Sequence, residues 1–238
     1  PCADGTPVVF HDSRLDGAGD SRGITDKSGV IWETPCEAVR EATVLDTDET
    51  IPTLSEALSV LPPDVGVNVE LKNPGSMDTR PGESLDPEAV AARRERWDPF
   101  VDRVVDELAG RDAEILASSF HEPALASVRD AAPNLPIGVL VGDSLSDGLA
   151  IAERYDCEAI HPPVESVLGA HYYTASAHHP TAETDPDLLF DTAADLGAEV
   201  NVWTVRTWHE AAQLAAAGVD GLIADYPGLL EFSEERIH

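Results

Sequence analysis

The sequence predicts one α/β domain built around a parallel β-sheet. Short β-rich runs alternate with helical stretches along most of the chain, and this alternation is typical of β-α units. The 238 residues and the 42% hydrophobic content are sufficient to bury one large core. We therefore expect a single domain over residues 1–238.

Local patterns predict the individual strands and helix ends. Seven short apolar runs predict strands: Val8–Phe10, Val65–Leu71, Glu114–Phe120, Ile137–Val141, Ala159–His161, Val200–Val205 and Gly221–Ala224. Thr53 and Glu56 have the spacing of a capping box before an apolar helical segment. Thr207 and Glu210 repeat this spacing, and Gly218 stands where that helix would end.

Three segments differ from this regular alternation. Residues 73–110 predict a helical crossover with one long amphipathic helix. The expected buried positions of this helix are Val101, Val104, Val105 and Leu108. Residues 13–48 are rich in Gly and Asp without clear periodicity and are predicted to be a long loop. Residues 169–186 are predicted to be a second long loop.

The composition is strongly acidic. The chain has 15 Lys and Arg residues against 45 Asp and Glu residues, which gives a formal charge of -30. Such a charge argues against binding nucleic acid or an anionic membrane by simple electrostatics, and an anionic substrate would need a local positive centre. The composition also predicts a salt-adapted protein, whose self-repulsion is screened in concentrated salt.

The cysteines and the hydropathy of the chain predict its cellular compartment. Cys2, Cys36 and Cys157 are far apart, odd in number and without paired metal-binding spacing, which favours a reducing cytoplasm. No uninterrupted apolar stretch approaches about 18 residues, so no membrane anchor is expected. The chain opens on Pro1 instead of Met, which predicts a processed or truncated product.

The segment GVNVELKNPG, residues 66–75, carries an acid and a base at the end of an apolar run. In a strand, Asn68, Glu70 and Lys72 share one face, while the apolar side chains between them share the other. Pro74 would stop the strand pairing, which leaves both charges at the carboxyl end. Alone, this pattern fits either a weak ion pair on the solvated face of an edge strand or a functional site.

His11 directly follows the short strand predicted in DGTPVVFHD. A histidine in this position is more often structural than catalytic. The Gly-rich loop that follows would leave His11 open to solvent, however. Because an imidazole titrates near neutrality, His11 would suit proton donation to a leaving alkoxide.

Six motifs occur in the order seen in the glycerophosphodiester phosphodiesterase family: ADGTPVVFHD, IPTLSEAL, NVELK, LASSF, VNVWTV and GVDGLIADYP. The sequence resembles this family from Asp4 to Pro227. The resemblance implies a TIM (β/α)8 barrel of the phospholipase C-like phosphodiesterase type. It also implies hydrolysis of small-molecule glycerophosphodiesters to glycerol 3-phosphate and an alcohol, with a divalent cation, Ca2+ or Mg2+. Active sites of such barrels gather at the carboxyl ends of the strands.

The resemblance implies roles for five residues. His11 would be the general acid, Glu70 a ligand of the cation, and Lys72 a catalytic contact to the phosphate. Phe120 and Trp203 would contact the glycerol moiety of the substrate. Strand alternation places Trp203 at the barrel mouth if its neighbouring valines face the helices, but a large core residue would fit the sequence equally well.

The sequence departs from the family pattern at its beginning. The family's His-Arg-Gly strand and Glu-x-Asp strand do not occur, so a second His, an Arg and two metal carboxylates are missing from the expected site. Six barrel strands run from NVELK to GLIAD, with Val8–Phe10 as a hairpin arm, so the first two of eight strands are expected to be absent. The loop after His11 also lacks the family's Arg-Thr-Thr run. The chain as written is therefore expected to be inactive.

Two other functions stay open at this point. The main alternative is a non-catalytic barrel that binds a phosphorylated ligand or partner, because half of the expected site is missing. A phospholipase-type barrel acting on a lipid head group is less favoured, because the surface is acidic and no apolar anchor is predicted. The sequence leaves the alcohol portion of the substrate and the oligomeric state open.

Four other histidines are candidates for the site. His171, His178 and His179 are interpreted as part of a solvated loop, because no nearby Cys or carboxylate completes a metal-binding pattern. His161 lies at a predicted strand end and would be able to line the site. It is assigned no role.

Overall fold

The centre of the structure is a single sheet of six parallel strands, which are neighbours in the order of the sequence. This computed structural model describes residues 1–19, 21–111, 113–169 and 185–229. Six of the seven predicted strands are confirmed, within two residues at each end. They are β1 (Val67–Glu70), β2 (Ile115–Ser119), β3 (Ile137–Leu140), β4 (Ala159–His161), β5 (Glu199–Val205) and β6 (Gly221–Ala224).

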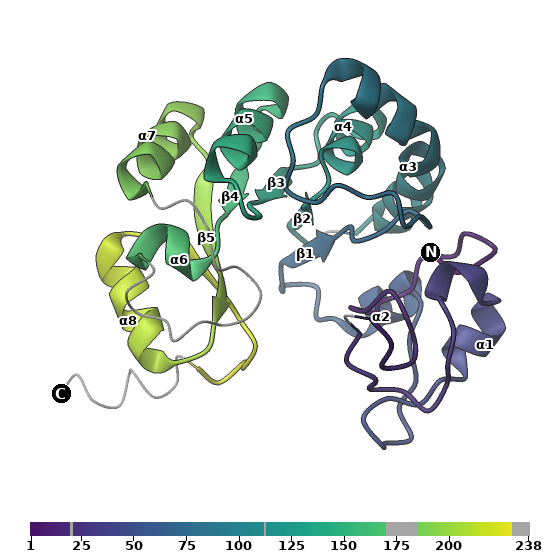
Figure 1. Cartoon of the computed structure of the whole chain (residues 1–238). Helices are drawn as coiled ribbons and strands as arrows, with labels where there is room; N and C mark the ends of the chain where they lie inside the picture. The colour runs from purple at the N-terminus through teal and green to yellow at the C-terminus, as the bar shows by residue number, and fades with distance from the viewer. Residues whose placement is uncertain (20, 112, 170–184, 230–238) are drawn as a thin grey trace.

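Helices connect the strands, because each pair of parallel strands needs a crossover between them. The connecting helices are α3 (Pro87–Leu108), α4 (Glu122–Ala131), α5 (Leu145–Tyr155), α6 (Val164–Leu168), α7 (Pro186–Leu196) and α8 (Trp208–Ala217). Two further helices, α1 (Cys36–Arg40) and α2 (Leu54–Val60), come before β1. Figure 1 shows α3, α4, α5 and α7 along the outer side of the curled sheet. In the described residues the sheet begins at β1 and ends at β6, so it forms a curled half-barrel of six parallel strands.

Strand alternation decides which side chains enter the core. In β5, Val200 and Val202 are buried in the core that the sheet shares with α7 and α8. Asn201 and Trp203, on the opposite face, are only half-buried. Trp203 is therefore not a fully buried core residue, and the predicted alternation is confirmed.

The predicted helix ends are also confirmed. The hydroxyl of Thr53 accepts a hydrogen bond from the backbone of Glu56, and the Glu56 carboxylate accepts one from the backbone of Thr53. Thr207 and Glu210 make the same reciprocal pair at the start of α8. Gly218 ends α8 in the left-handed conformation, with a φ of 88° that suits glycine.

The crossover between β1 and β2 contains the predicted long helix, α3. The carboxylate of Asp86 caps this helix by accepting a hydrogen bond of 2.8 Å from its first turn. Val101, Val104 and Leu108 are buried, as expected. Val105 is only half-buried and packs at the margin of the core.

The segment before β1 forms a small lobe of its own beside the sheet (Figure 1). The predicted strand Val8–Phe10 is wrong, because Val8 forms only one isolated antiparallel bridge, to Thr53. The pairing stops there since Pro7 and Pro52, which flank the bridge, have no backbone N–H to extend a ladder.

The prediction of one long loop over residues 13–48 is wrong in part. This segment contains a 3-10 helix, Ile31–Glu33, and the short helix α1. A helix of five residues is too short to show a repeating apolar pattern, so sequence periodicity could not reveal it. The lobe has a separate core, formed by Cys2, Leu15, Ile31, Val39, Ala42 and Ile51.

Most of the second predicted loop lies outside the described residues. His171, His178 and His179 fall in residues 170–184 and lie outside them too. The last predicted loop position, residue 186, is instead the first residue of α7. Within the described part of the chain, no helix combines the length and the apolar character needed to cross a membrane.

A buried carboxylate joins α4, α5 and the segment before α3. The side chain of Glu122 is fully buried, and one of its oxygens pairs with the guanidinium of Arg154. The same oxygen accepts a hydrogen bond from the Tyr155 hydroxyl at 3.1 Å, and the other accepts one from the Leu85 backbone at 2.5 Å. Arg154 also donates to the carbonyl oxygen of Leu85 at 2.9 Å.

Removing the cation of this network should destabilise the fold. Arg154→Met would leave the Glu122 carboxylate buried without its ion-pair partner, and we expect a loss of about 3 kcal/mol in the free energy of unfolding. Urea denaturation measures this loss. Arg206→Met is the matched control, because Arg206 and Asp225 form a half-exposed pair at 3.6 Å, for which about 1 kcal/mol or less is expected. Equal losses in the two variants would contradict the structural role of Glu122.

Candidate active site

A cavity of about 800 Å³ lies between the N-terminal lobe and β1. Its walls are mainly apolar, with Phe10, Ile31 and Ile51 on the side of the lobe and Val69 and Leu71 on the side of the sheet. A largely apolar cavity with a few converging polar groups is the usual form of a small-molecule site.

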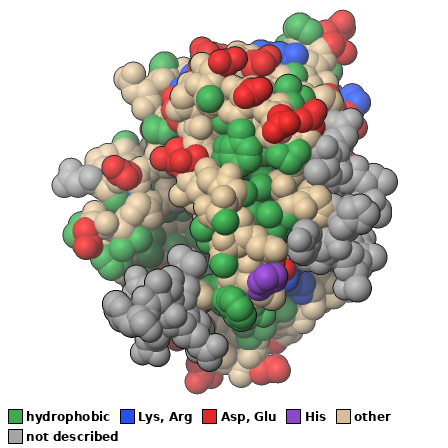
Figure 2. Space-filling model, turned by 90° about the vertical axis from the view of Figure 1, so that its left-hand side faces the viewer, with side chains coloured by type: hydrophobic (Ala, Val, Ile, Leu, Met, Phe, Trp, Pro, Cys, Tyr) green, Lys and Arg blue, Asp and Glu red, His purple; other side chains and the backbone are tan. Residues whose placement is uncertain are grey.

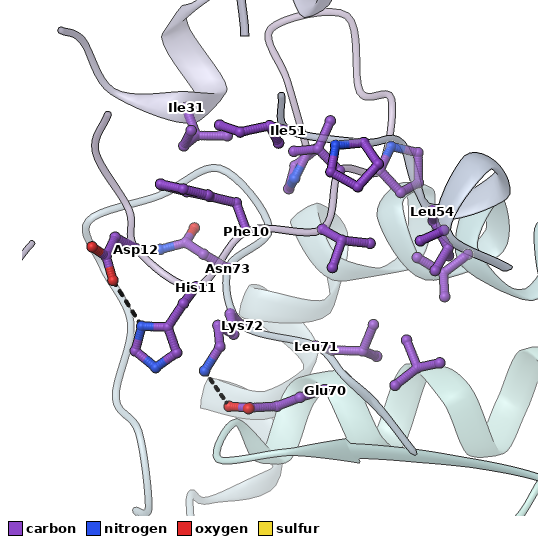
Figure 3. A pocket seen from close by; sticks show the side chains of 18 of the residues that line it. Phe10, His11, Asp12, Ile31, Ile51, Leu54, Glu70, Leu71, Lys72 and Asn73 are labelled. Atoms are coloured by element: carbon purple, nitrogen blue, oxygen red, sulfur yellow. Dashed lines mark hydrogen bonds and ion pairs between the residues drawn. The ribbon is translucent and has the colours of Figure 1, made fainter. Parts of the chain in front are cut away.

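The polar groups of the cavity come from the carboxyl end of β1 and from the lobe (Figure 3). Glu70 is the last residue of β1, and Lys72 follows two residues later on the same face, as predicted. The Lys72 ammonium donates a hydrogen bond of 2.7 Å to the Glu70 carboxylate. Their side chains are 32% and 29% exposed, so the pair is neither buried nor fully solvated.

The lobe contributes a histidine that is held by an aspartate. Nδ1 of His11 lies 2.8 Å from Oδ1 of Asp12, and the His11 side chain is 63% exposed while that of Asp12 is 3% exposed. The Asp12 carboxylate also accepts hydrogen bonds from the backbone N–H of Arg22 at 2.7 Å and from its guanidinium at 3.1 Å. Asp12 is therefore fixed from two sides.

These contacts decide the protonation of the pair. Burial would raise the pKa of Asp12, but the hydrogen bonds from Arg22 and His11 outweigh it and hold the pKa below its ordinary value. An ionised carboxylate can only accept hydrogen bonds, so Nδ1 of His11 carries a proton. Nε2 is then left to exchange a proton with a substrate.

Phe120 and Trp203 pair with each other but are not among the described residues that line the cavity. Their rings meet edge to face, with centroids 5.4 Å apart. The indole N–H of Trp203 donates to the carbonyl oxygen of His161 at 2.7 Å. Because Glu70 pairs with Ser118 in the sheet, Phe120 lies two residues further on the face of Lys72. Both aromatic residues thus lie near the carboxyl end of the sheet.

Sequence reasoning did not assign roles to Asp12 or His121. The adjacent His-Asp pair was visible in the sequence, but only the structure shows that the two side chains interact. His121 is buried against Trp97, with ring centroids 5.3 Å apart, and hydrogen-bonds to the backbone of Lys72. Burial lowers the pKa of His121 to about 4, so it supports the Lys72 segment as a neutral ring.

The ring of His161 is a polar group buried inside the sheet. Glu70, Ser118 and Gly138 are in register on three neighbouring strands. The His161 ring fills the space that a side chain at residue 138 would occupy, since a Cβ there would lie 3.0 Å from its Nε2. His161 is 1% exposed, and neither of its ring nitrogens has a hydrogen-bond partner within the described residues.

The comparison with known proteins is consistent with this geometry. The sequence matches the glycerophosphoryl diester phosphodiesterase family over residues 2–229. The chain belongs to this family. A glycerophosphodiester phosphodiesterase of Caldanaerobacter subterraneus subsp. tengcongensis is 25% identical over 228 residues, which are 95% of this chain and 79% of that protein.

Solved structures share the fold of this family member. A phosphodiesterase of Oleispira antarctica, in complex with the product sn-glycerol-3-phosphate, has a TM-score of 0.72 at 25% identity and covers 98% of this chain and 81% of its own. A glycerophosphodiester phosphodiesterase of Parabacteroides distasonis has a TM-score of 0.63 at 21% identity, with coverages of 97% and 79%. The second likeness shows the fold alone.

The divalent cation that the family resemblance implies fits the described residues only in part. Ca2+ and Mg2+ prefer several oxygen ligands. Within the described ranges, Glu70 is not part of a group of three or more close ligand atoms, and its carboxylate is paired with Lys72. Glu70 thus fits as one ligand, but the described residues do not form a complete site for a hard cation.

The buried His161 should make stability depend on pH. Burial lowers its pKa from 6.5 to about 4, so the unfolded chain binds a proton more readily than the folded one between these values. Neutral His161 therefore makes its full contribution to the free energy of unfolding above pH 6.5, and this contribution is lost as the pH falls toward 4. At pH 5 the loss amounts to about 2 kcal/mol.

Urea denaturation at pH 7 and pH 5 tests this dependence in His161→Leu and in the parent. The acidic surface also titrates, so the informative quantity is the difference between the two proteins. We expect the variant to lose about 2 kcal/mol less than the parent on acidification. His209→Leu, which changes an exposed histidine on α8, should behave like the parent. An identical loss in His161→Leu and the parent would show that His161 does not titrate as described.

Proposed function

We propose that this protein hydrolyses glycerophosphodiesters to glycerol 3-phosphate and an alcohol. The observation that carries the proposal is that the His11–Asp12 pair and the Lys72–Glu70 pair face one cavity at the carboxyl end of β1. Such barrels carry their chemistry at this end of the strands. The proposal also draws on the family membership and on the product named for the Oleispira antarctica relative.

Lys72 would bind the phosphate of the substrate. An ammonium group has three N–H donors, and Lys72 uses one of them on Glu70, so the others can meet phosphate oxygens. Asp and Glu side chains gather at the upper end and along the margins of the face shown in Figure 2, and the formal charge is -30. An anionic substrate therefore depends on a local cation such as Lys72.

Glu70 would supply one ligand to a divalent cation. The carboxylate neutralises Lys72 in the described pair, so a cation held beside Glu70 would restore positive charge to this end of the cavity. When bound, such a cation would act as a Lewis acid toward the phosphate. The choice between Ca2+ and Mg2+ depends on ligands beyond Glu70.

His11 would act as the general acid. With the proton of Nδ1 held by Asp12, an imidazolium can release the proton on Nε2 to the alkoxide that leaves phosphorus. The Asp12 carboxylate stabilises the charged ring before the transfer and keeps its orientation. The hydrogen bonds from Arg22 hold Asp12 itself in place.

Phe120 and Trp203 would contact the carbon backbone of the glycerol moiety. Their edge-to-face pair presents apolar ring surface near the end of the sheet that carries Lys72. The Trp203 N–H is already satisfied by the His161 carbonyl oxygen, which favours an apolar contact over a hydrogen bond to the substrate.

One observation favours a second candidate function. His11 is the only histidine and Lys72 the only lysine among the described residues that line the cavity, so a second proton-transfer histidine is not present there. A non-catalytic domain that binds a phosphorylated ligand would need Lys72 but not His11. Hydrolysis distinguishes the two functions.

The role of His11 can be tested in a chain that also carries the family's His-Arg-Gly and Glu-x-Asp strands, by measuring glycerol 3-phosphate released from glycerophosphocholine with Ca2+ or Mg2+ present. His11→Ala should lower turnover by about a hundredfold or more, because the leaving alkoxide loses its proton donor. His209→Ala removes an exposed histidine on α8 and should leave turnover unchanged. Equal turnover in both variants would exclude His11 as the acid. Product binding without any release, in a chain that also carries the His-Arg-Gly and Glu-x-Asp strands, would favour the binding domain.

A further inference from the structure

Three side chains with metal-binding atoms lie together in the N-terminal lobe, and none of them lines the cavity that holds the residues assigned to catalysis. A sulfur of Cys2, a sulfur of Cys36 and a carboxylate oxygen of Asp4 all lie within 4.8 Å of one another. Within the described residues this is the one group of three or more such ligand atoms. Their separation in the sequence hid this grouping, because Cys36 is 34 positions after Cys2 and neither belongs to a paired motif.

Backbone hydrogen bonds hold the three residues in place. The first residues form a tight turn, in which the backbone N–H of Cys2 donates to Thr6 and the carbonyl oxygen of Cys2 accepts from Gly5, both at 2.9 Å. The backbone of Ala3 donates to Thr34 at 3.0 Å, which fastens this turn beside the start of α1. Cys36 is the first residue of α1. The ligand atoms are thus brought together by contacts other than their own.

The surroundings leave one side of the group open. Cys2 is buried in the core of the lobe, Cys36 is half-buried, and Asp4 is exposed. The Asp4 carboxylate accepts a hydrogen bond of 3.0 Å from the backbone N–H of Thr6 and another from the Thr6 side chain, which restrain it within 4.8 Å of the two sulfurs. A carboxylate has about four lone-pair sites, so it can still accept a metal ion. An ion bound here would have protein ligands on the inner side and solvent on the outer side.

The donor set selects the kind of metal. Two thiolates and one carboxylate suit Zn2+, which accepts sulfur and oxygen ligands in tetrahedral sites. Ca2+ and Mg2+ avoid sulfur, so this group differs in chemistry from Glu70. Zinc binds thiolates, so both thiols release their protons when the metal binds.

We propose that Cys2, Asp4 and Cys36 bind one Zn2+ ion, with water as the fourth ligand. The ion would join the first turn of the chain to α1 and so stabilise the lobe that carries His11 and Asp12. It would act through structure, since its ligands are not among the described residues that line the cavity with the assigned catalytic groups. Zinc binding can be measured without any diesterase activity, so this inference and the proposed function can fail separately.

The test is zinc affinity of the full chain, measured by competition with a chromogenic chelator under a non-thiol reductant. The parent should bind one Zn2+ per chain with a Kd of about 1 μM or tighter. Cys36→Ser should weaken binding by about a hundredfold, because a hydroxyl replaces a thiolate ligand. Asp4→Asn should weaken it by about tenfold, since a neutral oxygen remains. Excess Ca2+ or Mg2+ should not displace the zinc.

Cys157→Ser is the matched control, because Cys157 is a free, buried cysteine outside the group. It should bind zinc like the parent. Replacing zinc by Co2+ should give thiolate-to-cobalt absorption in the parent and in Cys157→Ser, and this absorption should decrease strongly in Cys36→Ser. Zinc should also raise the melting temperature of the parent and of Cys157→Ser but not that of Cys36→Ser.

Three results would overturn the proposal. The first is an absence of stoichiometric zinc binding by the reduced parent. The second is an equal loss of affinity in Cys36→Ser and Cys157→Ser. The third is a Cys2–Cys36 disulfide in the isolated protein, seen as a loss of two hydrogens in the intact mass, together with no zinc binding after reduction. Cys36→Ser and Asp4→Asn change side chains that are not fully buried, so the test does not depend on replacing Cys2.

Discussion

The candidate site depends on one ion pair, between Lys72 and Glu70, at the carboxyl end of β1. Both side chains are about 30% exposed, so the pair adds little to stability and some solvation is lost in holding it there. Its position follows from the backbone: β1 pairs with β2 from Val67 to Glu70, and alternation then turns Lys72 to the same face. The ion pair thus contributes little to stability, although the pairing of β1 with β2 fixes its position. This combination favours a functional role over a structural one.

The lobe completes the site because it brings His11 to this end of β1. The extended segment before His11 is held by its bridge to Thr53, the residue that also caps α2. Arg22 then fixes Asp12, and Asp12 fixes the His11 ring. The geometry of the proposed acid thus rests on contacts within the first 53 residues, whereas the phosphate and cation contacts rest on the sheet.

The sequence predicted most of the sheet and little of the lobe. Apolar runs such as Ile137–Val141 identify strands because both faces of a parallel sheet are covered, and capping boxes identify helix starts by local chemistry. In the lobe, α1 is too short for a periodic pattern. The contact of Cys2 with Cys36 joins residues 34 positions apart, and the fixing of Asp12 by Arg22 depends on an irregular loop that no periodic pattern describes. Of the five predicted site residues, His11, Glu70 and Lys72 line the cavity. Phe120 and Trp203 lie near the carboxyl end of the sheet but are not among the described residues that line it.

The most direct test of the account is protection by glycerol 3-phosphate in a thermal melt of the parent, Lys72→Met and Lys27→Met. Lys27 and Lys72 are the only lysines of the sequence, and Lys27 is exposed in the lobe. Methionine keeps the apolar stem and removes the charge. The account predicts equal protection of the parent and Lys27→Met, and an affinity lower by about tenfold or more in Lys72→Met. Equal protection of all three proteins would contradict it and would place the phosphate elsewhere.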